Sequence, residues 1–192
     1  MAIIHRATLT PTKLELLEAW LPSQPWFPGG SAAGLERVAA FRFDDPAGEV
    51  GVETLLVRTP GGPLLQVPLT YRGAPLEGGE AWLVGTMQHS ALGPRWVYDA
   101  EGDPVYVAEL TRVIREGDGE VEQFYDTPQG PEPRPDDTHV HGSGGPAAGS
   151  AERGRLTVVR VLDGTTTAPA GAATLTGTWA DHPGPALLAT LA

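Results

Sequence analysis

The stretch GTMQHSALGPRWVYDAEGDPVYV, Gly85–Val107, joins a strand, a turn and a helix start, and this junction decides the fold. Glu80–Met87, which runs into it, and Arg95–Asp99 have the apolar and aromatic composition of strands. Gly85 indicates a bulge in the first strand, because a glycine inside a strand often marks an irregular pairing. Asp99 and Asp103 follow, and we interpret them as a turn residue and a helix cap.

A helix is predicted directly after this junction, over residues 103–116. Asp103 suits the N-cap, Pro104 the first helical position and Gly117 the position after the last turn. Between them, apolar side chains recur on one helical face: Tyr106, Leu110, Val113 and Ile114. This pattern predicts a helix with one side buried.

A second, shorter helix is predicted nearer the N-terminus, over Thr12–Leu21. Thr12 and Glu15 have the spacing of a capping box, in which each side chain binds the other residue's backbone N–H. Thr10 followed by Pro11 is a competing start, because proline favours the first helical position. Both alternatives place a helix ahead of the strands.

Strands dominate the region between the two helices. Residues 35–43, 49–59 and 63–72 have strand composition, and the sequence PGG between the last two predicts a hairpin. Pro68 lies inside the third strand, which predicts an edge strand or a bulge because proline lacks an N–H. We therefore expect an α+β fold: a curved, mainly antiparallel sheet packed on one or two helices, with further strands at the C-terminus.

The composition changes after residue 126. Residues 127–154 contain many Pro, Gly and Ser residues and few large apolar ones, which predicts a flexible linker or long loop. Residues 155–192 contain three further strand patterns. We expect a first domain over residues 1–126, and C-terminal strands over 155–192 that complete the main sheet or form a small annex.

Composition excludes several classes of function. The chain has 192 residues and a formal net charge of −11; Lys13 is its only lysine and its arginines are scattered, so nucleic acid is not an expected partner. It has no cysteine, which excludes disulfides and thiolate chemistry. We find no signal peptide and no apolar run of about 18 residues, so we expect a cytoplasmic protein without membrane contact.

The polar residues form no catalytic pattern. His89 and Ser90 are adjacent, and neighbouring residues of an extended segment point to opposite faces, so the histidine is poorly placed to activate the serine. We expect these groups to cap backbone amides instead. His139 and His141 have a spacing found in metal sites, but no third ligand is assured, and no phosphate-binding loop occurs. We predict no catalytic residue, no metal and no cofactor.

Aromatic residues provide the candidate surface. The loop PSQPWFPGG carries two aromatic residues that either enter the core or form a surface patch, and Arg95 is expected to bridge carbonyls or an acid. We expect Trp96 and Tyr98 to pack on opposite faces of a short strand. The candidate interaction or sugar-stacking residues are Trp26, Phe27, Arg95, Trp96 and Tyr98.

Three strings resemble the N-terminal cap domain of actinobacterial maltokinases, including forms fused to trehalose synthase. They are LLEAWLPSQPWFPGG, PLTYRGAPLEGGEAWLVGTMQHS and the opening stretch. The resemblance covers roughly residues 1–116. The matching positions are Trp26, Phe27, Gly29, Pro68, Leu69, Tyr71, Arg72 and Gly85–Tyr106.

The resemblance implies a curved antiparallel sheet on helices, likened to cystatin, and a role beside a kinase that phosphorylates maltose for α-glucan synthesis. The family's kinase catalytic loop is missing here: the nearest string is HVHGSGG, with Ser143 where the catalytic base would be. Proteins of this kind are sometimes labelled 1,4-α-glucan branching proteins, but 192 residues are too few for a (β/α)₈ barrel of about 250.

We therefore expect a non-catalytic accessory domain that interacts with another protein. The expected partner is a second copy, through an exposed sheet edge, or an enzyme of trehalose or α-glucan metabolism. Because Pro68 weakens its own strand as a donor, the C-terminal strands are the expected edge. The alternative is a sugar-binding module in which tryptophans stack on sugar rings, with Trp26, Trp82, Trp96 and Trp179 as candidates.

Overall fold

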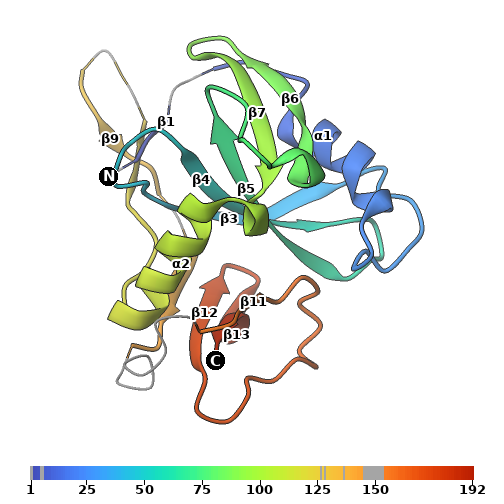
Figure 1. Ribbon diagram of the computed structural model, residues 1–192, viewed down its shortest axis with the longest axis vertical. Coiled ribbons are helices and arrows are strands. Elements are labelled where there is room, and N and C mark those ends of the chain that lie inside the picture. The colour runs from blue at the N-terminus through green and yellow to red at the C-terminus, as the bar shows by residue number, and fades with distance from the viewer. Residues whose placement is uncertain (1, 5–6, 126, 128, 136, 145–153) are drawn as a thin grey trace.

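The computed structural model describes residues 2–4, 7–125, 127, 129–135, 137–144 and 154–192. It has the predicted α+β fold, built around a six-stranded antiparallel sheet that curls into a half-barrel (Figure 1). The strand order is β2-β6-β7-β5-β4-β3. The strands are β2 (Leu9–Thr10), β3 (Glu36–Phe43), β4 (Gly51–Arg58), β5 (Leu64–Arg72), β6 (Leu83–His89) and β7 (Gly93–Asp99).

Both predicted helices are confirmed. Helix α1 (Lys13–Trp20) starts at Thr12, whose side chain forms the reciprocal capping box with Glu15. Helix α2 (Pro104–Glu116) starts at Asp103 and ends at Gly117, which has φ +68°, a conformation that favours glycine. Three short 3₁₀ segments are η1 (Leu21–Ser23), η2 (Glu80–Trp82) and η3 (Ala100–Gly102). None of the described helices is long and apolar enough to cross a membrane.

Helix α1 packs against one face of the curled sheet. Leu17 of α1 and Leu21 of η1 have no exposed surface and share an apolar cluster with the sheet. The sheet residues of that cluster include Leu55, Val57, Leu65, Val67, Leu69, Met87 and Val97. These residues define what we call the inner face, and Leu65, Val67 and Leu69 of β5 lie on it together.

Helix α2 and a second sheet cover the opposite face, which we call the outer face. This four-stranded sheet has the order β10-β12-β13-β11 and is antiparallel. Its strands are β10 (His139–Gly142), β11 (Leu156–Val158), β12 (Ala173–Trp179) and β13 (His182–Leu191). Phe41, Phe43 and Val52 of the main sheet share one buried cluster with α2 and with Leu175 and Leu188 of this second sheet.

The prediction of an edge position for the strand containing Pro68 is wrong. Strand β5 lies between β7 and β4 in the middle of the sheet. On the β7 side, β5 pairs with β7 only from Leu69 onward, and its first residues pair with the segment around Val161. The backbone N–H of Gln66 points to that side. Pro68 is two residues further along the strand, so its nitrogen points to the same side. It lies between the part of β5 that pairs near Val161 and the part that pairs with β7, where no backbone hydrogen bond is lost.

Part of the predicted linker takes part in sheets. A small third sheet joins β1 (Ala2–Ile4), parallel to β8 (Gln123–Tyr125), with β9 (Glu132–Pro133). Thus β9 and β10 both fall within residues 127–154, and residues 128, 136 and 145–153 lie outside the described part. The C-terminal strands β11, β12 and β13 form a sheet with β10, and two backbone hydrogen bonds, from Gln66 to Arg160 and from Leu162 to Leu64, connect the segment after β11 to β5. The domain boundaries remain predictions.

Candidate functional site

The aromatic pair of the predicted surface packs against the inner core. Trp26 and Phe27 are partly buried there. The Trp26 ring meets Trp20 edge to face at 5.9 Å between centroids, and the guanidinium of Arg160 lies 4.8 Å from its centre. These contacts hold the Trp26 ring between α1 and the C-terminal segment.

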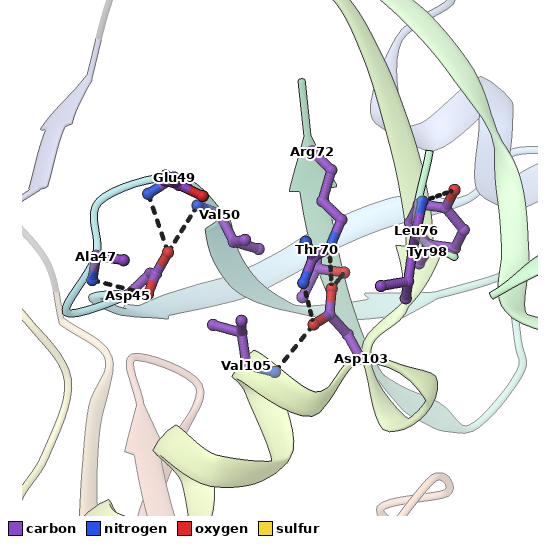
Figure 2. Close-up of polar contacts among 10 residues, drawn as sticks. All are labelled: Asp45, Ala47, Glu49, Val50, Thr70, Arg72, Leu76, Tyr98, Asp103 and Val105. Atoms are coloured by element: carbon purple, nitrogen blue, oxygen red, sulfur yellow. Dashed lines mark hydrogen bonds and ion pairs between the residues drawn. The ribbon is translucent and has the colours of Figure 1, made fainter. Parts of the chain in front are cut away.

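The other three predicted residues lie on β7 and divide between its faces. Trp96 and Tyr98 share the outer face, because residues two apart in a strand point the same way. The expectation of opposite faces is therefore wrong. Tyr98 is only 2% exposed, and its phenol oxygen accepts a hydrogen bond from the amide of Leu76 (2.9 Å; Figure 2). Arg95 directly precedes Trp96 in the sequence and is therefore on the inner face.

Asp103 holds together the junction quoted at the start of the sequence analysis. Its fully buried carboxylate accepts hydrogen bonds from the amide of Val105 (3.0 Å), the hydroxyl of Thr70 (2.8 Å) and two nitrogens of Arg72 (both 2.7 Å; Figure 2). Burial alone favours the neutral acid, but the bonds from Arg72 and Thr70 outweigh it and lower the pKa of Asp103. The predicted cap is confirmed, and its bonds to β5 give it a structural role.

A buried ion pair connects the C-terminal segment to this junction. Arg160 binds both carboxylate oxygens of Asp99 (2.6 and 2.7 Å) and also contacts Glu101. Arg160 is 8% exposed and Asp99 is 3% exposed. The sequence contains no local signal for this pair, because its members are separated by 61 residues.

A cavity of about 600 Å³ opens on the inner face, beside the region that α1 fills. Strands β2 and β3, at opposite ends of the sheet, both contribute to its wall, so the cavity lies within the curl. The polar lining includes Lys13, Arg42, Asp44, Tyr71, His89 and Arg95. The apolar lining of the inner face includes Leu9, Met87 and Leu92. Of the residues predicted for the interaction surface, Arg95 alone belongs to this lining.

A buried carboxylate organises the cavity wall. Glu53 of β4 is 4% exposed, and Lys13, the first residue of α1, binds it through the ammonium group. Tyr71 donates its hydroxyl hydrogen to Glu53 (2.9 Å), and Nη1 of Arg42 lies 4.0 Å from the carboxylate. Burial opposes ionisation, but Lys13 and then Arg42 outweigh it and lower the pKa of Glu53 to about 2. Glu53 is therefore ionised at neutral pH.

The aromatic ring of Tyr71 is also part of this arrangement. The ammonium of Lys13 lies 5.1 Å from the ring centre, within cation–π range. Gly51 is the register partner of Tyr71 on β4, and a Cβ there would lie 3.3 Å from Nη2 of Arg42 and 3.5 Å from Cβ of Tyr71. A glycine at this position lets Arg42 and Tyr71 approach each other.

A tight turn forms the opposite rim of the cavity, between β3 and β4. Asp45 accepts hydrogen bonds from the backbone amides of Ala47 (3.0 Å), Glu49 and Val50 (both 2.9 Å; Figure 2). These bonds lower the pKa of Asp45 despite the opposing effect of burial. The rim is thus fixed by its own backbone, with the carboxylates of Asp44 and Glu49 beside it.

Sequence analysis missed the cavity, although one signal for it was available. Glu53 is the one charged residue in the interior of β4, which otherwise has Arg58 at its end, and it requires a partner if the strand is buried. The only lysine of the chain, Lys13, was the obvious candidate. The remaining members could not be assigned, because the curl of the sheet decides which strand ends meet.

The histidine–serine pair has the capping role that was predicted. Nδ1 of His89 accepts hydrogen bonds from the amides of Ala91 (3.2 Å) and Leu92 (3.1 Å). The hydroxyl oxygen of Ser90 accepts one from the amide of Thr8 (3.0 Å). These bonds fix the β6–β7 turn. Both side chains bind backbone amides and do not form a nucleophile–base pair with each other.

The other predicted candidates lie apart from the cavity. Nδ1 of His139 is 2.9 Å from Glu120, and within the described part of the chain no three potential metal ligands cluster. Trp179 is 5% exposed and its ring stacks on His182. The tryptophans considered for sugar stacking are absent from the cavity lining, which includes the aromatic ring of Tyr71.

Part of the chain matches the model of a known family. Residues 20–103 match the family model of the maltokinase N-terminal cap domain, from the end of α1 to the cap of α2. The matched segment includes Arg42, Glu53 and Tyr71 but not Lys13, and it is shorter than the 1–116 expected from resemblance. No curated protein matches the chain.

Proposed function

We propose that this protein is a non-catalytic accessory domain that binds and regulates an enzyme, in the manner of a cap without its kinase. The match of residues 20–103 to the maltokinase N-terminal cap domain carries this proposal. A cap accompanies a catalytic body, and the sequence here lacks the family's kinase catalytic loop. The proposed partner is a cytoplasmic enzyme of trehalose or α-glucan metabolism.

The start of β6 is the contact surface that the geometry favours. Trp82 and Leu83 are each 40% exposed, and both belong to the matched segment. Strand β2 pairs only with Gln88 and His89. The preceding part of β6 pairs with β7 on one side, and its other side has no strand partner among the described residues. Exposed apolar side chains beside an open strand edge suit association with another protein. The C-terminal edge expected earlier is the alternative, through β10 or the three-residue β11.

Affinity purification from the native cytoplasm, combined with light scattering on the pure chain, tests this proposal. We expect the chain to retain an α-glucan or trehalose enzyme. Leu83→Lys should abolish retention, because it places a charge in the apolar contact. Leu92→Lys is the matched control, since Leu92 is 46% exposed at the far end of the β6–β7 hairpin, and it should retain the enzyme.

Two results would contradict the proposal. One is a strictly monomeric chain that retains no such enzyme. The other is sugar-dependent release of ADP from Mg²⁺-ATP by the pure chain, with maltose or glucosamine as acceptor, if substitution of a single carboxylate removes it. The second result would show catalysis by the chain itself.

A further inference from the structure

We propose that the inner-face cavity binds a neutral polyhydroxyl molecule of sugar size. The cavity of about 600 Å³ is within the range of small-molecule sites. Its wall contains an organised polar cluster, Lys13–Glu53–Tyr71, next to an apolar surface. The proposal concerns the isolated chain and does not depend on the enzyme partner.

The buried carboxylate is the first argument. Removing a carboxylate and an ammonium group from water is unfavourable, and apolar residues of similar volume are often as stabilising as a buried pair. Stability therefore does not explain why Glu53 lies within the apolar strand β4. Its bonds do hold the Lys13 ammonium and the Tyr71 hydroxyl in fixed positions at the cavity wall. Fixed polar groups reduce the entropy that ligand binding costs.

The charge of the lining is the second argument. Lys13, Arg42 and Arg95 contribute positive charge to the lining, and the rim residues Asp44 and Glu49 contribute negative charge. A bound anion would be repelled by the carboxylates, and a bound cation would be repelled by the guanidinium groups. A hydroxyl group avoids both penalties because it donates and accepts hydrogen bonds.

The apolar wall is the third argument. Leu9, Met87 and Leu92 line the cavity together with the polar residues. A sugar ring presents C–H groups on its faces and hydroxyl groups around its edge. A wall that is partly apolar and partly composed of charged donors and acceptors matches that division. A fully apolar ligand would leave these charged groups desolvated without partners.

Titration calorimetry and thermal unfolding of the intact chain test the proposal. Three probes share one ring and differ in charge: glucose is neutral, glucose 6-phosphate is anionic and glucosamine is cationic; maltose adds a larger neutral probe. We expect heat and a raised Tm with glucose or maltose, since a ligand that binds only the folded state stabilises it. The charged analogues should bind more weakly than glucose. A site that prefers either charged analogue would overturn the assignment of a neutral ligand.

Two variants locate the site. Arg95→Gln removes a lining cation whose Nη1 donates to the carbonyl of Pro94 and not to Glu53, and loss of a charge-assisted hydrogen bond to the ligand should weaken binding by about tenfold or more. Arg58→Gln is the matched control, because Arg58 is exposed at the end of β4 outside the cavity. Equal loss in both variants would place binding elsewhere. Absence of heat and of a Tm shift with all four probes would overturn the proposal.

Discussion

Burying the ionised carboxylate of Glu53 is unfavourable by itself, but the same carboxylate positions polar groups at the cavity wall. Its pKa of about 2 lies below the ordinary value of 4.5, so the folded state binds the proton more weakly than the unfolded chain. The resulting stability is present above pH 4.5 and is lost as the pH falls toward 2. By linkage its size is on the order of 3 kcal/mol.

We therefore predict that Glu53→Gln reduces the loss of stability in acid. The free energy of unfolding of the wild-type chain should fall steeply between pH 5 and pH 2, and the variant should lack most of the part due to this site. Asp103 and Asp45 also have lowered pKa values, so some acid sensitivity should remain in both proteins. Urea unfolding at several pH values measures the difference. If the free energy of unfolding falls by the same amount with pH in both proteins, the assignment of the lowered pKa to Glu53 is contradicted.

A second prediction at the residue scale tests whether the Lys13–Glu53 pair stabilises the fold or only positions polar groups. Lys13→Met leaves the Glu53 carboxylate buried without its closest cation, and should destabilise the fold by about 3 kcal/mol. The double variant Lys13→Met, Glu53→Met should recover most of that loss, because an apolar pair needs no solvation. Urea unfolding of both single variants and the double variant gives the coupling. A double variant as unstable as the sum of the single variants would show no coupling between Lys13 and Glu53 and would contradict this prediction.

At the scale of elements, Asp103 connects α2 to β5. Asp103→Ala removes the helix cap and leaves the Thr70 hydroxyl and the Arg72 guanidinium without their carboxylate. We predict a loss of about 3 kcal/mol, of which about 1 kcal/mol is the cap. Asp163→Ala is the control: that residue accepts bonds only within an exposed turn at Thr165, and its loss should cost well under half as much. Chemical denaturation compares the two, and equal costs would be inconsistent with the buried network.

The elements also show what the sequence could and could not predict. Both helices were predictable because their signals are local: Thr12 with Glu15, and Asp103 with Pro104 and Gly117. The position of Pro68 was not predictable, because it depends on where two separate partners of β5 stop pairing. The Arg160–Asp99 pair and the cavity arise from contacts between distant segments, which no local pattern specifies.

At the scale of the whole molecule, the C-terminal strands belong to the same packing unit as the half-barrel. One buried cluster combines Phe41 and Val52 of the main sheet with Leu188 of β13. The side-chain amide of Gln66, itself 2% exposed, donates to the carbonyls of Val159 (3.0 Å) and Leu188 (2.8 Å). Separating the two sheets would expose this core and break these buried hydrogen bonds, so neither sheet is expected to remain folded alone.

We predict a single cooperative unfolding transition for the full chain. Trp179 reports on the second sheet and Trp26 on the inner side of the half-barrel, so each can be monitored in a variant in which the other four tryptophans are replaced by Phe. Both reporters should give the same midpoint, and the calorimetric enthalpy should equal the van't Hoff enthalpy. Arg160→Met should lower both midpoints together, because it leaves Asp99 buried without its cation. Earlier unfolding at Trp179 than at Trp26 would instead show that residues 155–192 are an independent annex on a cap that is stable without them.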